Sequence, residues 1–153
     1  MPKTTVRLGR EGYRTEIKAR NHVFYADESL ESGGEDSAPE PVELLVGAVG
    51  ACIAVTTRLY AQRKGWPLEG VEVALDYERF NGKDYPAYDG SAAFIHEFRN
   101  QIVFHGPLSD EQRARLAEIA TKCPVHRIVE YPAFFVDVDD LLESEDELTA
   151  DAP

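Results

Sequence analysis

The segment 41–64 limits the fold of this chain more than any other part of the sequence. It contains a long apolar run, and a polar turn at 62–64 followed by Gly-Trp-Pro at 65–67 predicts that a helix ends there. The first four turns of this helix are apolar on nearly all sides, whereas a helix packed on one sheet needs only one apolar face. Small residues that permit close approach of a second helix are Gly47, Ala48, Gly50, Ala51 and Ala54. We infer a homodimer with this helix at its centre; the alternative is a monomer that buries it under two sheets.

The net charge of −12 over 153 residues restricts the partners of the protein. Because this charge repels phosphate backbones and anionic lipid headgroups, we expect no binding to nucleic acid or membrane, and we expect small molecules or another protein chain as partners. We find no apolar stretch of the about 20 residues that span a bilayer, and no apolar signal core at the amino terminus. The length fits one domain, and we expect a cytoplasmic protein.

Strand patterns precede the long helix. The segments 5–8 and 13–19 predict a hairpin through the glycine-containing turn 9–12, and the segment 22–26 predicts a third strand. Residues 27–40 contain acidic residues, glycine, serine and proline with almost no apolar anchor, which is typical of a mobile surface loop.

Further elements follow the long helix. The alternation over 71–77 and the pattern over 94–104 predict two strands that pair antiparallel. Ser109 and Gln112 have the spacing of a capping box, so a second helix is expected to begin there. A last strand over 133–138 then precedes a strongly acidic tail.

Cys52 and Cys123 are the only two cysteines of the chain. Because they are 71 residues apart (123 − 52), a Cys-x-x-Cys redox motif and a closed four-cysteine zinc site are excluded, and any shared chemistry requires the fold to bring them together. Cys123 precedes Pro124, which favours the start of a helix, and this position lowers the pKa of a thiol, whereas an apolar mid-helix setting raises it. Helix position alone favours Cys123 as the nucleophile. For each cysteine, simple burial without a chemical role is the alternative.

Three motifs give the chain a resemblance to a known family. They are PVELLVGAVGAC at 41–52, LYAQRKGWPLEGV at 59–71, and LSDEQ at 108–112 leading to CPVHR at 123–127. In this order, and with both cysteines in place, the chain resembles the OsmC/Ohr family of osmotically induced and organic-hydroperoxide-resistance proteins, in its OsmC-like branch. The resemblance covers roughly residues 5–138.

The resemblance implies an α+β, OsmC-like fold. Its parts are N-terminal antiparallel strands, a long central helix, a strand pair, C-terminal helices and a last strand. Two chains interlock as a homodimer, and the two cysteines of each subunit meet near the interface. One OsmC-like domain is expected over 1–140, followed by an acidic tail at 141–153 that we expect to be disordered.

The resemblance also implies a chemistry for the two thiols. In peroxidase members the first cysteine is oxidised by an organic hydroperoxide to sulfenic acid, and the second resolves it as a disulfide. Carried over, Cys52 attacks and Cys123 resolves, which reverses the ranking from helix position. The turn Gly-Arg-Glu-Gly at 9–12 resembles the Gly-Arg-Asp-Gly turn that supplies an arginine in the Ohr branch. Arg10 is therefore the candidate to stabilise the Cys52 thiolate, and a solvated hairpin tip is the alternative.

One position departs from the family pattern. Ten residues before the attacking cysteine, where the best-characterised peroxidases have a glutamate that holds the arginine, this chain has Val42. Glu43 follows one residue later, about 100° further round a helix, and is common at this place in the broader OsmC-like branch. We retain Glu43 as a candidate site residue, against the alternative that it only complements the helix dipole.

Two histidines have candidate roles. The spacing Cys123-x-x-His126 contains two potential metal ligands without a second pair, so we expect no metal site and a His126 that packs beside Cys123. His96 lies in a mostly apolar strand pattern, which predicts a core histidine with a hydrogen-bond partner.

The family resemblance therefore implies a cysteine-based hydroperoxide reductase, a peroxidase of oxidative-stress defence that acts on organic or lipid hydroperoxides. It implies no cofactor, and a dithiol reductant such as a lipoylated protein. We expect apolar side chains such as Phe24, Leu45 and Tyr60 to line the substrate pocket. The alternative, favoured by Val42, is a non-peroxidatic OsmC-like dimer that binds a small apolar ligand.

Overall fold

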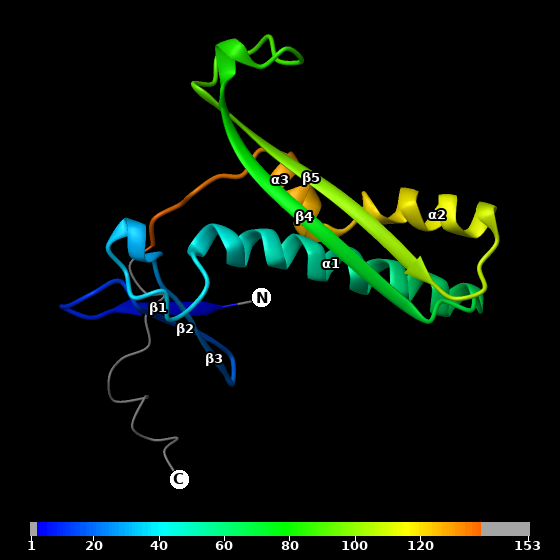
Figure 1. Cartoon of the computed structure of the whole chain (residues 1–153), viewed down its shortest axis with the longest axis horizontal. Helices are drawn as coiled ribbons and strands as arrows, with labels where there is room; N and C mark the ends of the chain where they lie inside the picture. Colours follow the sequence, from blue (N-terminus) through cyan, green and yellow to red (C-terminus); the bar gives the residue numbers. More distant parts are fainter. Residues whose placement is uncertain (1–2, 139–153) are drawn as a thin grey trace. The chain divides into compact units, whose positions relative to one another are not determined.

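The structure of the protein, a computed structural model, describes residues 3–138 (Figure 1). Within this range the chain divides into two compact units. The N-terminal unit consists of residues 3–41 with 133–138, and the central unit consists of residues 42–132. The predicted disordered tail at 141–153 lies outside the described residues, and the single domain over 1–140 stays a prediction.

The N-terminal unit contains a three-stranded antiparallel sheet in the order β1-β2-β3. The strands are β1 (Thr4–Leu8), β2 (Thr15–Ala19) and β3 (His22–Ala26). Gly12 adopts a φ of 70° in the first turn, a conformation that glycine reaches without a steric penalty. The predicted hairpin and third strand are confirmed, with strand ends within two residues of the predicted ones.

The loop between β3 and the long helix is held by internal hydrogen bonds. The backbone N–H of Asp27 donates to the carbonyl of Pro39 at 3.1 Å, which ties the two ends of the loop together. The Asp27 carboxylate, 1% exposed, accepts hydrogen bonds from the hydroxyl of Ser37 at 2.7 Å and from its backbone N–H at 3.0 Å. These hydrogen bonds, the hydroxyl first, lower the pKa of Asp27. Internal hydrogen bonds thus support this loop without an apolar anchor, and its predicted mobility stays a prediction.

The predicted last strand over 133–138 is not formed within the described residues. Phe134 is 88% exposed and Phe135 is fully exposed. A β-prone sequence gives a strand only where an edge is available for its ladder hydrogen bonds, and the pattern alone does not supply that edge.

The central unit combines three helices with a long hairpin. It contains α1 (Pro41–Lys64), β4 (Gly70–Asn81), β5 (Phe94–His105), α2 (Asp110–Ala120) and α3 (Pro124–Glu130). The β4–β5 ribbon runs beside α1 (Figure 1), and its antiparallel register pairs Val73 with Ile102. The Ser109 hydroxyl accepts from the Gln112 backbone while the Gln112 side chain accepts from the Ser109 N–H, so the predicted capping box is confirmed.

Two apolar clusters hold the central unit together. The first joins α1 to the start of α3 and the hairpin, through Val49, Ile53 and Cys123 with Leu75 packed against them. The second joins the end of α1 to α2 and β5, through Ala61, Leu68, Phe104 and Leu116. Because both clusters use α1, this helix positions every other element of the unit.

Much of α1 nevertheless lacks cover in the single chain. Its exposed apolar side chains include Leu45 at 44%, Val55 at 58% and Leu59 at 47%. Among the described residues, α1 is the one helix that is both long enough and apolar enough to cross a membrane, judged by length and composition alone. The prediction that no stretch reaches this length is therefore wrong. A core helix of a soluble protein has the same properties, and one such helix is weak evidence for a membrane span.

Two glycines of α1 give a paired test of this packing. A Cβ added at Gly50 would lie 2.8 Å from Cδ1 of Leu75, whereas one added at Gly47 would meet nothing within 4 Å. Gly47→Ala should therefore raise the free energy of unfolding by about 0.5–1 kcal/mol. Gly50→Ala should be less stable than Gly47→Ala, because the Leu75 side chain must shift to admit the new methyl group. Urea unfolding at equal protein concentration measures both, and equal stabilities would contradict the packing of α1 on β4.

Candidate site: a two-cysteine centre

The two cysteines come from different elements of the central unit. Cys52 lies in the middle of α1 and is half-buried, and Cys123 is the N-cap of α3 and is 0% exposed. α1 forms because its apolar run has no interior proline, and α3 begins at Cys123 because Pro124 suits the first helical position. Both thiols are free cysteines in the structure.

The fold brings these two thiols together. Cys52 packs against the cluster that contains Cys123, Val49 and Ile53. The two thiols also lie within hydrogen-bonding reach of each other. The fold thus brings together two cysteines that are 71 residues apart in sequence, while a shared reactive pocket stays a prediction.

The pKa of Cys123 corrects the ranking that helix position suggested. Its Sγ accepts a hydrogen bond from the backbone N–H of His126 at 3.2 Å, as expected at a helix start, and this bond lowers the pKa. Burial acts in the opposite direction and is larger, and the hydrogen bond with Cys52 adds to it, so the pKa of Cys123 is raised above its ordinary value. Burial and the hydrogen bond with Cys52 thus favour the protonated form of Cys123.

This arrangement predicts an order of thiol alkylation. With iodoacetamide at pH 8, Cys52 in the folded protein should react at least about tenfold faster than Cys123, because Cys123 is buried and its pKa is raised. Peptide mass spectrometry over time measures both rates. In urea the two rates should become similar, and a Cys123 that reacts first in the folded protein would contradict the assigned burial.

The other two predicted site residues stay predictions. Arg10 lies in the exposed turn after β1, in the N-terminal unit, and makes no hydrogen bond or ion pair with another described residue. Glu43 lies in the first turn of α1. Nine residues separate it from Cys52, which on a helix corresponds to about 13 Å along the axis and about half a turn around it. Glu43 therefore does not touch Cys52 of its own chain, and any role must pass through another group. Val42, ten residues before Cys52, is 43% exposed.

His126 and His96, the two histidines with candidate roles, lie in different surroundings. The ring of His126 faces Glu130, with 3.8 Å between Nε2 and Oε2, and its backbone N–H donates to the Cys123 sulfur; the predicted packing of the ring beside Cys123 stays a prediction. His96 is exposed, so its prediction as a core residue is wrong, but its Nδ1 has the expected partner in the Tyr77 hydroxyl at 2.8 Å. Among residues 3–138 there is no group of three or more histidine, cysteine or acidic side chains that could hold a metal ion.

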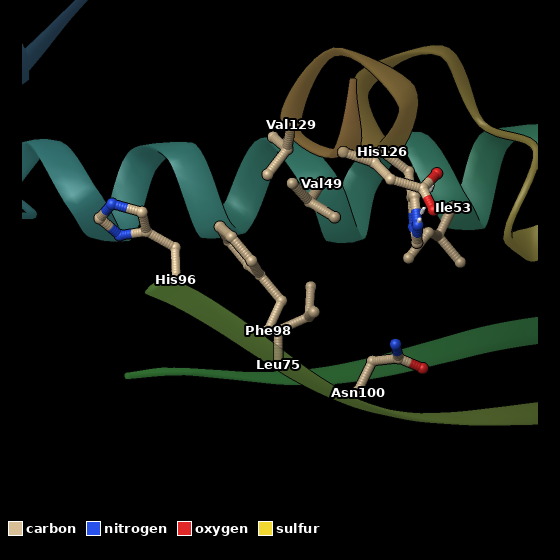
Figure 2. Close-up of a pocket in the computed structure, with 9 residues that line it drawn as sticks. Val49, Ile53, Leu75, His96, Phe98, Asn100, His126 and Val129 are labelled. Atoms are coloured by element: carbon tan, nitrogen blue, oxygen red, sulfur yellow. Dashed lines mark ion pairs between the residues drawn. The ribbon is translucent and has the colours of Figure 1, made fainter. Parts of the chain in front are cut away.

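A cavity of about 210 Å³ lies in the central unit near this centre (Figure 2). Its lining consists of Val49, Ile53, Leu75, His96, Phe98, Asn100, His126, Val129 and Glu130. None of the three side chains that we expected in a pocket is among them. Tyr60 packs edge-on against Trp66 instead, with ring centroids 5.5 Å apart, and Leu45 is 44% exposed. Phe24 belongs to the N-terminal unit.

The sequence did not predict this cavity, although the alternation pattern of the second hairpin strand contains three of its lining residues. The predicted face of the second hairpin strand contains His96 and Phe98, and the same alternation extends to Asn100. The contribution of α3 was not predictable, because it depends on how that helix packs across the hairpin.

The fold and the thiol pair define a class of protein: an α+β protein in which a long helix and a second, short helix bring two reduced cysteines into contact. The family model for OsmC-like protein matches residues 34–136. The chain belongs to the OsmC-like protein family, as its motifs indicated.

Solved structures share this fold at low sequence identity. A putative osmotic stress induced and detoxification response protein from Psychrobacter arcticus is 19% identical, with a TM-score of 0.67, over 84% of this chain and 88% of that one. OsmC of Legionella pneumophila, described as an organic hydroperoxide resistance protein, is 18% identical, with a TM-score of 0.60 and the same coverage. An organic hydroperoxide resistance protein from Elizabethkingia anophelis is 18% identical, with a TM-score of 0.63, over 84% of this chain and 87% of that one. No curated protein matches the chain.

Proposed function

We propose that the protein reduces organic or lipid hydroperoxides through Cys52 and Cys123, as a peroxidase that responds to oxidative stress. The contact between the two thiols carries this proposal, because a reactive and a resolving cysteine must reach each other to form a disulfide. The organic hydroperoxide resistance named for two proteins of the same fold supports it.

The reaction proceeds in three balanced steps. The Cys52 thiolate attacks the terminal oxygen of R–O–O–H, the O–O bond breaks, and the alkoxide takes up a proton to leave as an alcohol, with Cys52 as a sulfenic acid. The sulfur of Cys123 then attacks the sulfur of Cys52, and its proton leaves with the hydroxide as water. An external dithiol returns two electrons to the disulfide and becomes a disulfide itself. The raised pKa of Cys123 fits the second role, because its proton is needed for the departing hydroxide.

The proposal includes a cytoplasmic homodimer and a dithiol reductant such as a lipoylated protein. The exposed apolar side chains of α1 support the dimer, since a second copy of this helix would remove them from water. We assign to Arg10 the stabilisation of the Cys52 thiolate, and to Glu43 the positioning of that arginine. Both assignments rest on the family resemblance.

A direct assay tests the reaction. Reduced protein mixed with cumene hydroperoxide and dihydrolipoamide should consume the hydroperoxide at a rate proportional to protein concentration. Without dihydrolipoamide, each chain should consume one hydroperoxide and lose about 2 Da as its disulfide forms. If the unmodified protein consumes no hydroperoxide, the enzyme proposal fails and the non-peroxidatic alternative remains.

A further inference from the structure

The cavity of about 210 Å³ is a separate site from the two sulfurs. It lies between α1, the β4–β5 hairpin and α3, and neither cysteine lines it. Val49 and Ile53 belong both to its wall and to the core cluster that contains Cys123. A molecule in the cavity is therefore divided from the thiol pair by these side chains and is not positioned to react with it.

The cavity has an apolar middle and polar ends. Figure 2 shows Val49, Phe98 and Val129 between His96 at one end and the side chains of His126 and Asn100 at the other. Apolar walls with a few polar groups are typical of small-molecule sites. At about 30 Å³ for each water-sized unit, the volume accommodates a ligand of roughly seven non-hydrogen atoms.

Hydrogen-bonding capacity at the Asn100 end indicates the chemistry of the ligand. Asn100 is exposed at the mouth of the cavity, its side-chain amide makes no hydrogen bond with another residue of the described chain, and it can offer a ligand both a donor and an acceptor. His126 lines the same cavity, with its Nε2 3.8 Å from the Glu130 carboxylate, beyond ordinary hydrogen-bond length. A hydroxyl group can donate and accept at once and so satisfies this end. The Glu130 carboxylate and the net charge of −12 oppose an anionic group there.

We propose that this cavity binds a small, uncharged, apolar molecule that carries one hydroxyl group, with the hydroxyl at Asn100 and His126. The proposal goes beyond the cysteine reaction and does not depend on it. A non-reacting molecule of this class is sufficient for the test, because no bond forms or breaks in the cavity.

Benzyl alcohol and benzoate are the probes, because they have similar size and differ in charge. The reduced full-length protein is titrated with each, and the ring resonances of its four histidines are followed by NMR. Benzyl alcohol should shift the signals of His96 and His126 saturably and leave those of His22 and His105, which do not line the cavity, unchanged. Benzoate should bind at least about tenfold more weakly because of the Glu130 charge. The proposal would be overturned if benzoate bound as tightly as benzyl alcohol does, or if the ring resonances of all four histidines shifted equally.

Two matched pairs of variants locate the ligand. Val129→Trp should fill the cavity and abolish binding, while Ile128→Trp, at a side chain that is 66% exposed and outside the lining, should not. Asn100→Leu should weaken the binding of benzyl alcohol by roughly three- to tenfold, which corresponds to the loss of one net hydrogen bond. Gln101→Leu, on the opposite face of the strand, should leave the binding unchanged. If Val129→Trp does not fold, the second pair decides. Unchanged binding in Asn100→Leu refutes the assigned hydroxyl position, and unchanged binding in Val129→Trp refutes the site.

The same titration separates this proposal from the peroxidase. Cys52→Ser should bind benzyl alcohol as the unmodified protein does, even where it has lost hydroperoxide reduction. A protein without hydroperoxide reduction that still binds benzyl alcohol would contradict only the peroxidase proposal. A protein that reduces hydroperoxide but does not bind benzyl alcohol would contradict only the cavity proposal.

Discussion

Cys52→Ser is expected to lower hydroperoxide consumption to the uncatalysed rate, a loss of about a thousandfold or more, as for other removed nucleophiles. Serine nearly preserves the volume of the half-buried side chain, so the helix and its packing should persist. The hydroxyl cannot form a sulfenic acid or a disulfide, so no partial reaction remains. The measurement is the initial rate with cumene hydroperoxide and dihydrolipoamide, with circular dichroism to verify the fold.

Cys123→Ser should behave differently and therefore serves as the paired variant. Each chain should consume one equivalent of hydroperoxide and then stop or slow by roughly tenfold or more, because Cys52 sulfenic acid has lost its resolving thiol. Dimedone labelling followed by mass spectrometry should find the adduct at Cys52. If Cys123→Ser has no first turnover while Cys52→Ser retains one, the two roles are exchanged and the proposed mechanism is wrong.

Local sequence patterns predicted the elements that hold the two thiols. The helix over 41–64 followed from its apolar run and its terminator, and the start of α3 followed from Cys123 and Pro124. The capping box at Ser109 needed only a spacing of three residues. These features are local, so neighbouring residues determine them with little help from the rest of the fold.

Nonlocal features were predicted less well. Helix position ranked Cys123 as the more acidic thiol, yet burial by α1 and the hairpin raises its pKa. Desolvation depends on what packs over a residue, and spacing along the chain does not show that. The same limit explains the wrong prediction of a strand over 133–138, because the partner edge that a strand needs depends on contacts across the fold.

Leu116→Ala is expected to cost about 2–5 kcal/mol of unfolding free energy. Leu116 is 0% exposed and packs in one cluster with Ala61 at the end of α1 and Phe104 of β5. Truncation would remove these contacts and leave a cavity where α2 packs against α1 and the β4–β5 hairpin. Thermal unfolding should show a midpoint lower by about 4–20 °C for a chain of this length.

Glu118→Ala on the same helix is the matched control for Leu116→Ala. It removes only an exposed ion pair with Arg115, so its effect should stay within about 1 kcal/mol. Both variants must be compared at one protein concentration, because dimer formation would make the midpoint depend on it. Since α2 leads directly into Cys123, Leu116→Ala should also increase the alkylation rate of that buried thiol before global unfolding. A Leu116→Ala protein as stable as Glu118→Ala would show that α2 does not depend on this cluster for its position.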